Sequence, residues 1–195
     1  MSGLFSLRSR VGMCGKFVSC RALGLTNVRF LSSFLKSYHV SGHGKQTTTI
    51  FNQPSLLTQV VSDVPVAMGG KDKGPEPVEL LLASLCGCEL VTAQFIARNM
   101  KPRVTIDQID FDIRASRDSR GALGLPIRKD TVLPPSRLER IWGTATLHTS
   151  ASEDEVELIA EEVKRRCPVA NMVMLSGCDL QIEFKKKKRG PKADS

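Results

Sequence analysis

Acidic residues are missing from the start of this chain, where neither Asp nor Glu occurs before Asp63. Residues 1–37 are rich in Ser, Leu and Phe and carry six Lys or Arg residues. A secretory signal needs an uninterrupted apolar core of about 7–15 residues. Basic side chains break every candidate core, at Arg8, Arg10, Lys16 and Arg21. This composition predicts a mitochondrial-type presequence over residues 1–37, with a plastid transit peptide and an unaddressed basic terminus as alternatives.

A processing site is also suggested within that segment. The run Arg29-Phe30-Leu31-Ser32-Ser33 resembles a matrix-processing site with Arg two residues before the cut. We therefore expect a mature chain that begins near Ser32 and resides in the mitochondrial matrix.

The chain also lacks a long apolar run free of polar residues. The nearest candidate, residues 78–97, contains Glu79, Glu89 and Gln94, which are costly in lipid. This pattern favours a buried helix of a soluble protein and predicts no membrane span.

The formal charge of +8 is concentrated at the two ends. Residues 185–195 add six bases and one acid, so the segment between the ends holds 16 basic and 19 acidic residues. A nucleic-acid-binding domain gathers basic side chains on its own surface. We therefore do not expect this domain, whose acidic residues outnumber its basic ones, to bind nucleic acid. Residues 186–195 are expected to form a disordered basic tail. Its Lys/Arg run resembles a nuclear-localisation or nucleic-acid-contacting segment, but it has no interleaved aromatic residues for base stacking.

Between the ends, the periodicity predicts an α+β domain over residues 38–185. Strand-like segments rich in Thr and Val, including 46–50 and 55–61, precede a long apolar helix that runs from about Pro75 or Pro77 to Met100. Alternation then predicts two antiparallel strands, at 104–116 and 140–149, separated by a long irregular loop. A helix with a Ser152–Glu155 capping box, a short helical turn and a last strand at 178–184 follow.

Six cysteines are present, and two of them, Cys14 and Cys20, lie in the presequence. The spacing of Cys86 and Cys88 does not match a zinc knuckle, so we expect no metal. Cys86 and Cys178 are interpreted as small buried apolar residues. Cys167 precedes Pro168, where a new helix would begin, and the helix dipole with Arg165 and Arg166 would favour its thiolate. Cys88 lies in an apolar helix, and sequence alone does not show that the two thiols meet.

Two motifs carry a family resemblance. The run from Gly74 to Cys88, with Gly-Pro-Glu-Pro followed by Leu-Ala-Ser-Leu-Cys-Gly-Cys, and the run Cys167-Pro168-Val169-Ala170-Asn171 together resemble the OsmC/Ohr family of osmotically inducible and organic-hydroperoxide-resistance proteins. The resemblance covers about residues 38–185 and is closer to the OsmC-like branch. It implies an intertwined homodimer in which antiparallel sheets wrap around central helices.

The resemblance also implies a function. Cys88 would be the peroxidatic cysteine that reduces organic hydroperoxides, with hydrogen peroxide as a further substrate, and becomes a sulfenic acid. Cys167 would be the resolving thiol that forms the Cys88–Cys167 disulfide. A dithiol such as dihydrolipoamide, commonly carried on a lipoylated protein, would reduce that disulfide, and no cofactor is implied.

The chain departs from the hydroperoxidase pattern at two places. Val78 stands where the family has a Glu that holds a catalytic Arg, and Glu79 follows as a candidate supporting carboxylate. No Arg occurs between Arg29 and Arg98. A positive charge near Cys88 would therefore have to come from Arg117, Arg120 or Arg128 in the long loop. The alternative is that these arginines are only solvated. The alternative for the whole protein is a non-catalytic redox sensor or a small apolar-ligand-binding dimer.

Overall fold

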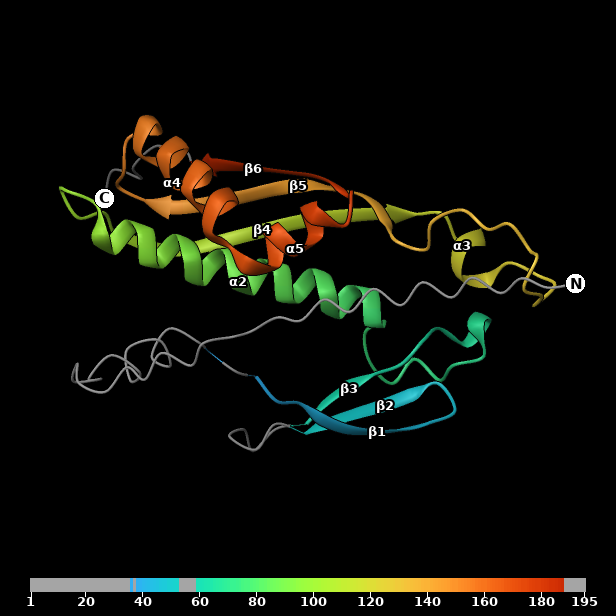
Figure 1. Cartoon of the computed structure of the whole chain (residues 1–195). Helices are drawn as coiled ribbons and strands as arrows, with labels where there is room; N and C mark the ends of the chain where they lie inside the picture. The colour runs from blue at the N-terminus through green and yellow to red at the C-terminus, as the bar shows by residue number, and fades with distance from the viewer. Residues whose placement is uncertain (1–35, 37, 53–58, 188–195) are drawn as a thin grey trace, which may run out of the picture. The chain divides into compact units, whose positions relative to one another are not determined.

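The computed structural model describes residue 36, residues 38–52 and residues 59–187 (Figure 1). Apart from Lys36, the predicted presequence lies outside the described residues, and so do residues 188–195 of the predicted tail. The compact unit begins at Ser41.

The first sheet consists of three short antiparallel strands in the order β1-β2-β3. They are β1 (Ser41–Lys45), β2 (Thr48–Asn52) and β3 (Val60–Ser62). The strand expected at 46–50 starts two residues later, because Gln46 adopts a φ of 59° in the turn between β1 and β2. Of the strand expected at 55–61, residues 59–61 are described, and Val60 and Val61 lie in β3.

A buried aspartate fixes the loop that leads from β3 to the long helix. Asp63 accepts hydrogen bonds from Val64 N at 2.9 Å, Thr48 Oγ1 at 3.1 Å and Lys71 N at 3.2 Å. Burial acts to raise the pKa of Asp63, but these and neighbouring hydrogen bonds outweigh it and hold the pKa at about 2. The loop, which includes the 3₁₀ turn η1 (Val66–Met68), is therefore tied to strands β2 and β3.

The long helix α2 (Pro77–Asn99) begins at Pro77 and ends before Pro102, as the positions of these two prolines predict. Pro77 occupies the first turn, where its missing N–H costs nothing. Glu79 Oε2 accepts from Glu76 N at 2.9 Å. The buried residues recur at helical spacing on one face, which packs against α4, α5 and β4: Leu85, Glu89, Ala93, Ile96 and Ala97.

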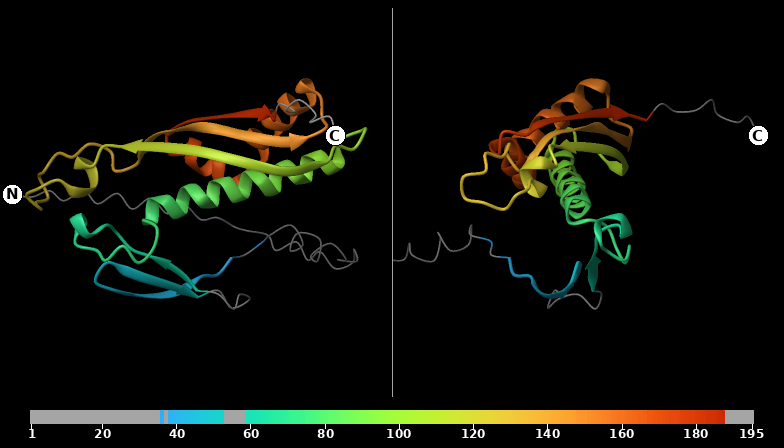
Figure 2. Two further views of the ribbon diagram at one scale, coloured as in Figure 1. Left: turned by 180° about the vertical axis from the view of Figure 1, so that it is seen from behind. Right: turned by 90° about the vertical axis from the view of Figure 1, so that its right-hand side faces the viewer.

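The second sheet is mixed. β4 (Ile106–Arg117) and β5 (Leu138–Thr149) are antiparallel, and β6 (Asp179–Lys186) pairs with β5 in parallel. The parallel pairing follows from the connection, since two helices carry the chain back across the sheet between β5 and β6. Figure 2 shows α2 along one face of this sheet, which leaves the opposite face of alternating polar residues open, as the alternation predicts.

Two consecutive helices form the crossover from β5 to β6. In α4 (Glu153–Arg166) the expected capping box is present, with Glu155 N donating to Ser152 Oγ at 3.2 Å and Ser152 N donating to Glu155 Oε2 at 2.7 Å. The expected short helical turn is an eight-residue helix, α5 (Pro168–Leu175). The long loop between β4 and β5 contains a four-residue helix, α3 (Arg120–Leu123).

The α+β fold class is confirmed, and the domain extends slightly further than expected. Lys186 belongs to β6, and Lys187 N donates to Leu147 O at 2.8 Å. Lys186, assigned to the tail, is therefore part of the sheet, and Lys187 follows the strand with a backbone hydrogen bond to it.

The helix α2 is, among the described residues, the one segment long and apolar enough to cross a bilayer by length and composition alone. Its core face packs against α4, α5 and β4, and it buries Glu89 there. One face of α2 therefore packs as predicted for a core helix, whereas Leu81, Val91 and Phe95 on the rest of the helix are exposed in this chain.

A glycine permits the close approach of β4 and β5. An added Cβ at Gly143 would lie 2.0 Å from Asp112 O, which is backbone and cannot move aside. We expect Gly143→Ala to lower the free energy of unfolding by roughly 2 kcal/mol or more, measured by urea denaturation. In Gly87→Ala, the control, the new methyl meets nothing within 4 Å, so stability should stay equal or rise slightly. Equal losses in both variants would contradict the backbone clash.

Candidate functional site

Cys88 and Cys167 come together where α2 packs against α5. Both are free thiols, and they lie close enough for Cys88 to affect the pKa of Cys167. Cys167 is fully buried, whereas Cys88 is only partly buried. The structure thus answers the question that the sequence left open, because the two thiols of the family motifs are neighbours in one chain.

Cys167 connects two helices. It is the C-cap of α4 and the N-cap of α5. At the N-cap position its Sγ accepts a hydrogen bond from Ala170 N at 3.5 Å. Asn171 steadies the junction because its Nδ2 donates to the carbonyl oxygens of Cys167 at 2.8 Å and Lys164 at 3.2 Å. The sequence analysis quoted Asn171 as part of a motif without giving it a role, and the structure makes it a positioning residue for Cys167.

The expectation of a stabilised Cys167 thiolate is wrong. Burial, with a smaller contribution from the neighbouring Cys88, raises the pKa of Cys167 to about 11, and the hydrogen bond from Ala170 N only partly opposes this rise. Arg165 and Arg166 do not help, since both bind the carboxylate of Glu162. Cys167 is therefore protonated at neutral pH.

The other candidate residues lie apart from the thiols. Glu79 precedes Cys88 by nine residues, about 13 Å of helix rise, and its carboxylate caps α2. Arg120 is held by Asp118, with Nη2–Oδ2 at 2.6 Å, while Arg117 and Arg128 are exposed at the end of β4 and in the long loop. Among the described residues, no cationic side chain forms a hydrogen bond or ion pair with either thiol.

The remaining cysteines behave as structural residues. Cys178 is buried, and burial raises its pKa. Cys86 is half-buried, and burial followed by the charge of Glu89 raises its pKa. Within the described part of the chain, no cluster of three or more His, Cys, Asp or Glu side chains is arranged to hold a metal ion.

Glu89 is the functional candidate that sequence reasoning missed. It lies at the centre of the core face of α2 with only 3% of its surface exposed, and its Oε2 has no hydrogen-bond partner among the described residues. Burial raises its pKa to about 7. The signal was available in the sequence, because Glu89 is an acid at core spacing between Leu85 and Ala93.

Burial of Glu89 should make stability depend on pH. The folded-state pKa of about 7 exceeds the ordinary 4.5, so the native state holds the proton more tightly and stability falls as pH rises from about 4.5 to 7. We expect Glu89→Gln to stabilise the protein by about 3 kcal/mol at pH 8 and by much less at pH 5, measured by urea denaturation. Glu161→Gln, on the exposed side of α4, is the control, and an equal gain at both pH values would refute the assignment.

Comparison with known proteins identifies the family. A family model described as OsmC-like protein matches residues 70–183. A hydroperoxide reductase from Mycoplasma pneumoniae is 25% identical over 131 residues, which span 64% of this chain and 82% of that protein. The crystal structure of an OsmC-like protein from Mycoplasma pneumoniae matches with a TM-score of 0.61 at 22% identity, covering 78% of this chain and 99% of the other. An organic hydroperoxide resistance protein OsmC from Legionella pneumophila matches with a TM-score of 0.56 at 16% identity, over 77% and 98% of the two chains. Since the family model covers more than half of the sequence, the chain belongs to the OsmC-like family.

Proposed function

We propose that this protein is a thiol peroxidase that reduces organic hydroperoxides, and hydrogen peroxide as a further substrate. The observation that carries the proposal is the contact between Cys88 and Cys167, in which one thiol is partly exposed and the other is buried. The matches to a hydroperoxide reductase and to an organic hydroperoxide resistance protein support the same chemistry.

The proposed reaction has three steps. The Cys88 thiolate attacks the terminal peroxide oxygen, the O–O bond breaks, and the alkoxide takes a proton to leave as an alcohol, so that Cys88 becomes a sulfenic acid. The Cys167 sulfur then attacks the Cys88 sulfur, a disulfide forms and water leaves. A dithiol such as dihydrolipoamide, carried on a lipoylated protein, reduces the disulfide by thiol–disulfide exchange and is itself oxidised.

The relative exposure of the thiols suits these roles. A partly exposed Cys88 can meet a peroxide, whereas a buried and protonated Cys167 is shielded from it. Protonation also gives Cys167 a proton to donate toward Cys88. The mitochondrial matrix, if residues 1–37 direct the chain there, would supply lipoylated proteins as reductants.

We further propose that the active form is a homodimer. Leu81, Cys88 and Phe95 follow one another at intervals of seven residues, two helical turns, and so lie along one stripe of α2. Beside this stripe Val91 is 66% exposed, and within it Phe95 is 52% exposed. Each chain contributes two three-stranded sheets in its described part, which suits assembly with a second copy into the intertwined homodimer implied by the family resemblance. A second copy packed along this stripe would place the thiol site at the interface between the two copies.

A redox sensor remains the second candidate function. The favouring observation is that no cation contacts Cys88 among the described residues, whereas a cation is the usual support for peroxide attack by a thiolate. A sensor would be oxidised once by peroxide but would not be turned over by dihydrolipoamide.

Peroxide consumption by the full chain tests the catalytic proposal. With dihydrolipoamide and cumene hydroperoxide or hydrogen peroxide, we expect sustained turnover that Cys88→Ser abolishes. Cys167→Ser should still form one sulfenic acid per chain, detected by dimedone labelling, but no intramolecular disulfide. Cys178→Ser is the control and should turn over normally. One oxidation per chain without turnover would favour the sensor, and turnover by Cys88→Ser would overturn both proposals.

The dimer has a separate test. Phe95→Asp should shift the mass measured by analytical ultracentrifugation from twice that of the chain to that of one chain, because a carboxylate is costly in an apolar contact. Glu157→Lys, on the exposed face of α4, controls for a change of surface charge and should stay dimeric. A wild-type protein that sediments as a monomer at micromolar concentration would refute the proposed dimer.

A further inference from the structure

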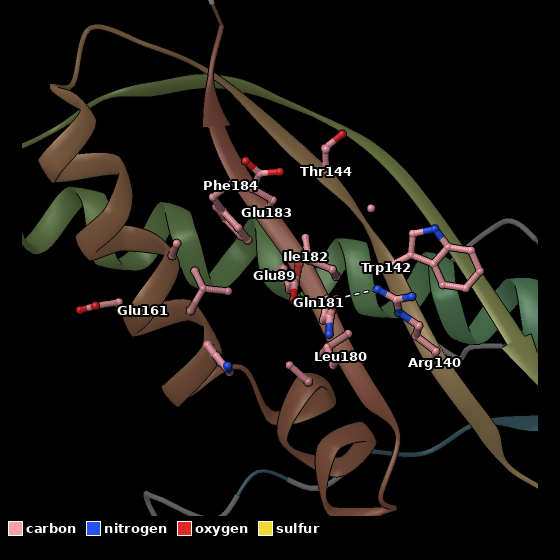
Figure 3. A pocket seen from close by; sticks show the side chains of 15 residues that line it. Glu89, Arg140, Trp142, Thr144, Glu161, Leu180, Gln181, Ile182, Glu183 and Phe184 are labelled. Atoms are coloured by element: carbon pink, nitrogen blue, oxygen red, sulfur yellow. Dashed lines mark hydrogen bonds between the residues drawn. The ribbon is translucent and has the colours of Figure 1, made fainter.

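A cavity of about 630 Å³ lies between α4 and β6, and we call it the α4–β6 cavity (Figure 3). Its inner wall is apolar: α4 contributes Ala160 and Val163, and β6 contributes Leu180, Ile182 and Phe184. Figure 3 shows Glu89 of α2 behind β6, near Ile182 and at the floor of the cavity. The size falls within the range of sites that hold small molecules, about 300–1,000 Å³.

The polar group at the floor has no partner. Glu89 is 97% buried, its Oε2 forms no hydrogen bond within the described part of the chain, and burial raises its pKa to about 7. Nearly all buried polar atoms in native proteins are paired, so an unpaired one needs an explanation. Glu89 is one of the residues that line the cavity, but its Oε2 is closed off from solvent, so a bound molecule that displaces a neighbouring side chain can supply the missing partner.

The charged groups at the rim do not neutralise Glu89. Arg140 Nη2 donates to Gln181 Oε1 at 2.7 Å, and its Nε lies 3.5 Å from Asp179 Oδ2. Glu183 pairs with Lys185 at 2.8 Å. The rim residues Glu161 and Lys164 of α4 are exposed, and neither forms an ion pair or hydrogen bond with Glu89.

We propose that the α4–β6 cavity binds a small apolar molecule that bears a primary amine, with the ammonium donating a hydrogen bond to Glu89 and the apolar body resting on the side chains of β6. An ammonium provides both the donor and the opposite charge that the buried carboxylate lacks. A neutral alcohol would provide a donor without the charge, and a carboxylate would be repelled.

This site adjoins the thiol pair but does not contain it. Neither Cys88 nor Cys167 lines the cavity, whereas Ala170, whose N–H bonds the sulfur of Cys167, does. Amine binding measured in Cys88→Ser, which lacks the proposed peroxidatic thiol, separates failure of one proposal from failure of the other.

Three probes of matched size test the proposal on the full chain: 2-phenylethylamine, 2-phenylethanol and phenylacetate. By isothermal titration calorimetry at pH 8, we expect one amine per chain, bound at least about tenfold more tightly than the alcohol, and no binding of phenylacetate. Glu89→Gln should weaken amine binding about tenfold or more and leave alcohol binding within about twofold. Glu157→Gln, on the exposed face of α4 and outside the cavity lining, should bind all three probes as the wild type does.

A second variant keeps the test decisive if Glu89→Gln does not fold. Ala160→Leu narrows the apolar wall and should weaken the amine and the alcohol alike, while the thermal midpoint reports whether the variant is folded. Amine binding that is no tighter than alcohol binding in the wild type, that persists at full strength in folded Glu89→Gln, or that is absent at millimolar amine would overturn the proposal.

Discussion

The site depends on the packing of α5 against the middle of α2. Small residues on the core face of α2, including Ala93 and Ala97, are fully buried and let the neighbouring elements approach closely. The chain reaches α5 through Cys167, which ends one helix and begins the next within a single residue. Because this turn is clamped by Asn171, the sulfur of Cys167 is placed by backbone geometry rather than by a flexible loop. Any chemistry of the thiol pair therefore follows from helix packing.

The pKa values of the buried acids and thiols depend on the balance between burial and the hydrogen bonds that reach the charged atoms. At the N-terminus of α5 the helix dipole and a hydrogen bond favour a thiolate, yet full burial raises the pKa of Cys167 to about 11. Asp63 shows the opposite balance, because several hydrogen bonds to its carboxylate outweigh burial. The difference between the two is the number of donors that reach the charged atom.

Much of the fold followed from local patterns in the sequence. The prolines around α2, the Ser152–Glu155 capping box and the alternation in β4 and β5 all act within a few residues, so these elements were predicted closely. The parallel pairing of β6 was not predicted, because strand direction depends on a crossover of two helices. The contact between Cys88 and Cys167 also depends on long-range packing, and the family resemblance supplied the expectation that periodicity could not. The sequence shows Glu89 only as a polar residue within an apolar helix. The three-dimensional structure is needed to show that its carboxyl lacks a hydrogen-bond partner.

The lysines at the end of β6 have a consequence for solubility. In this chain β6 lies at the edge of its sheet, where unpaired backbone groups invite pairing with another exposed strand. Lys185 and Lys186 lie in this strand, and Lys187 follows it while remaining bonded to Leu147. Positive charge on Lys185, Lys186 and Lys187 repels the same edge of another molecule and so opposes edge-to-edge pairing of this strand.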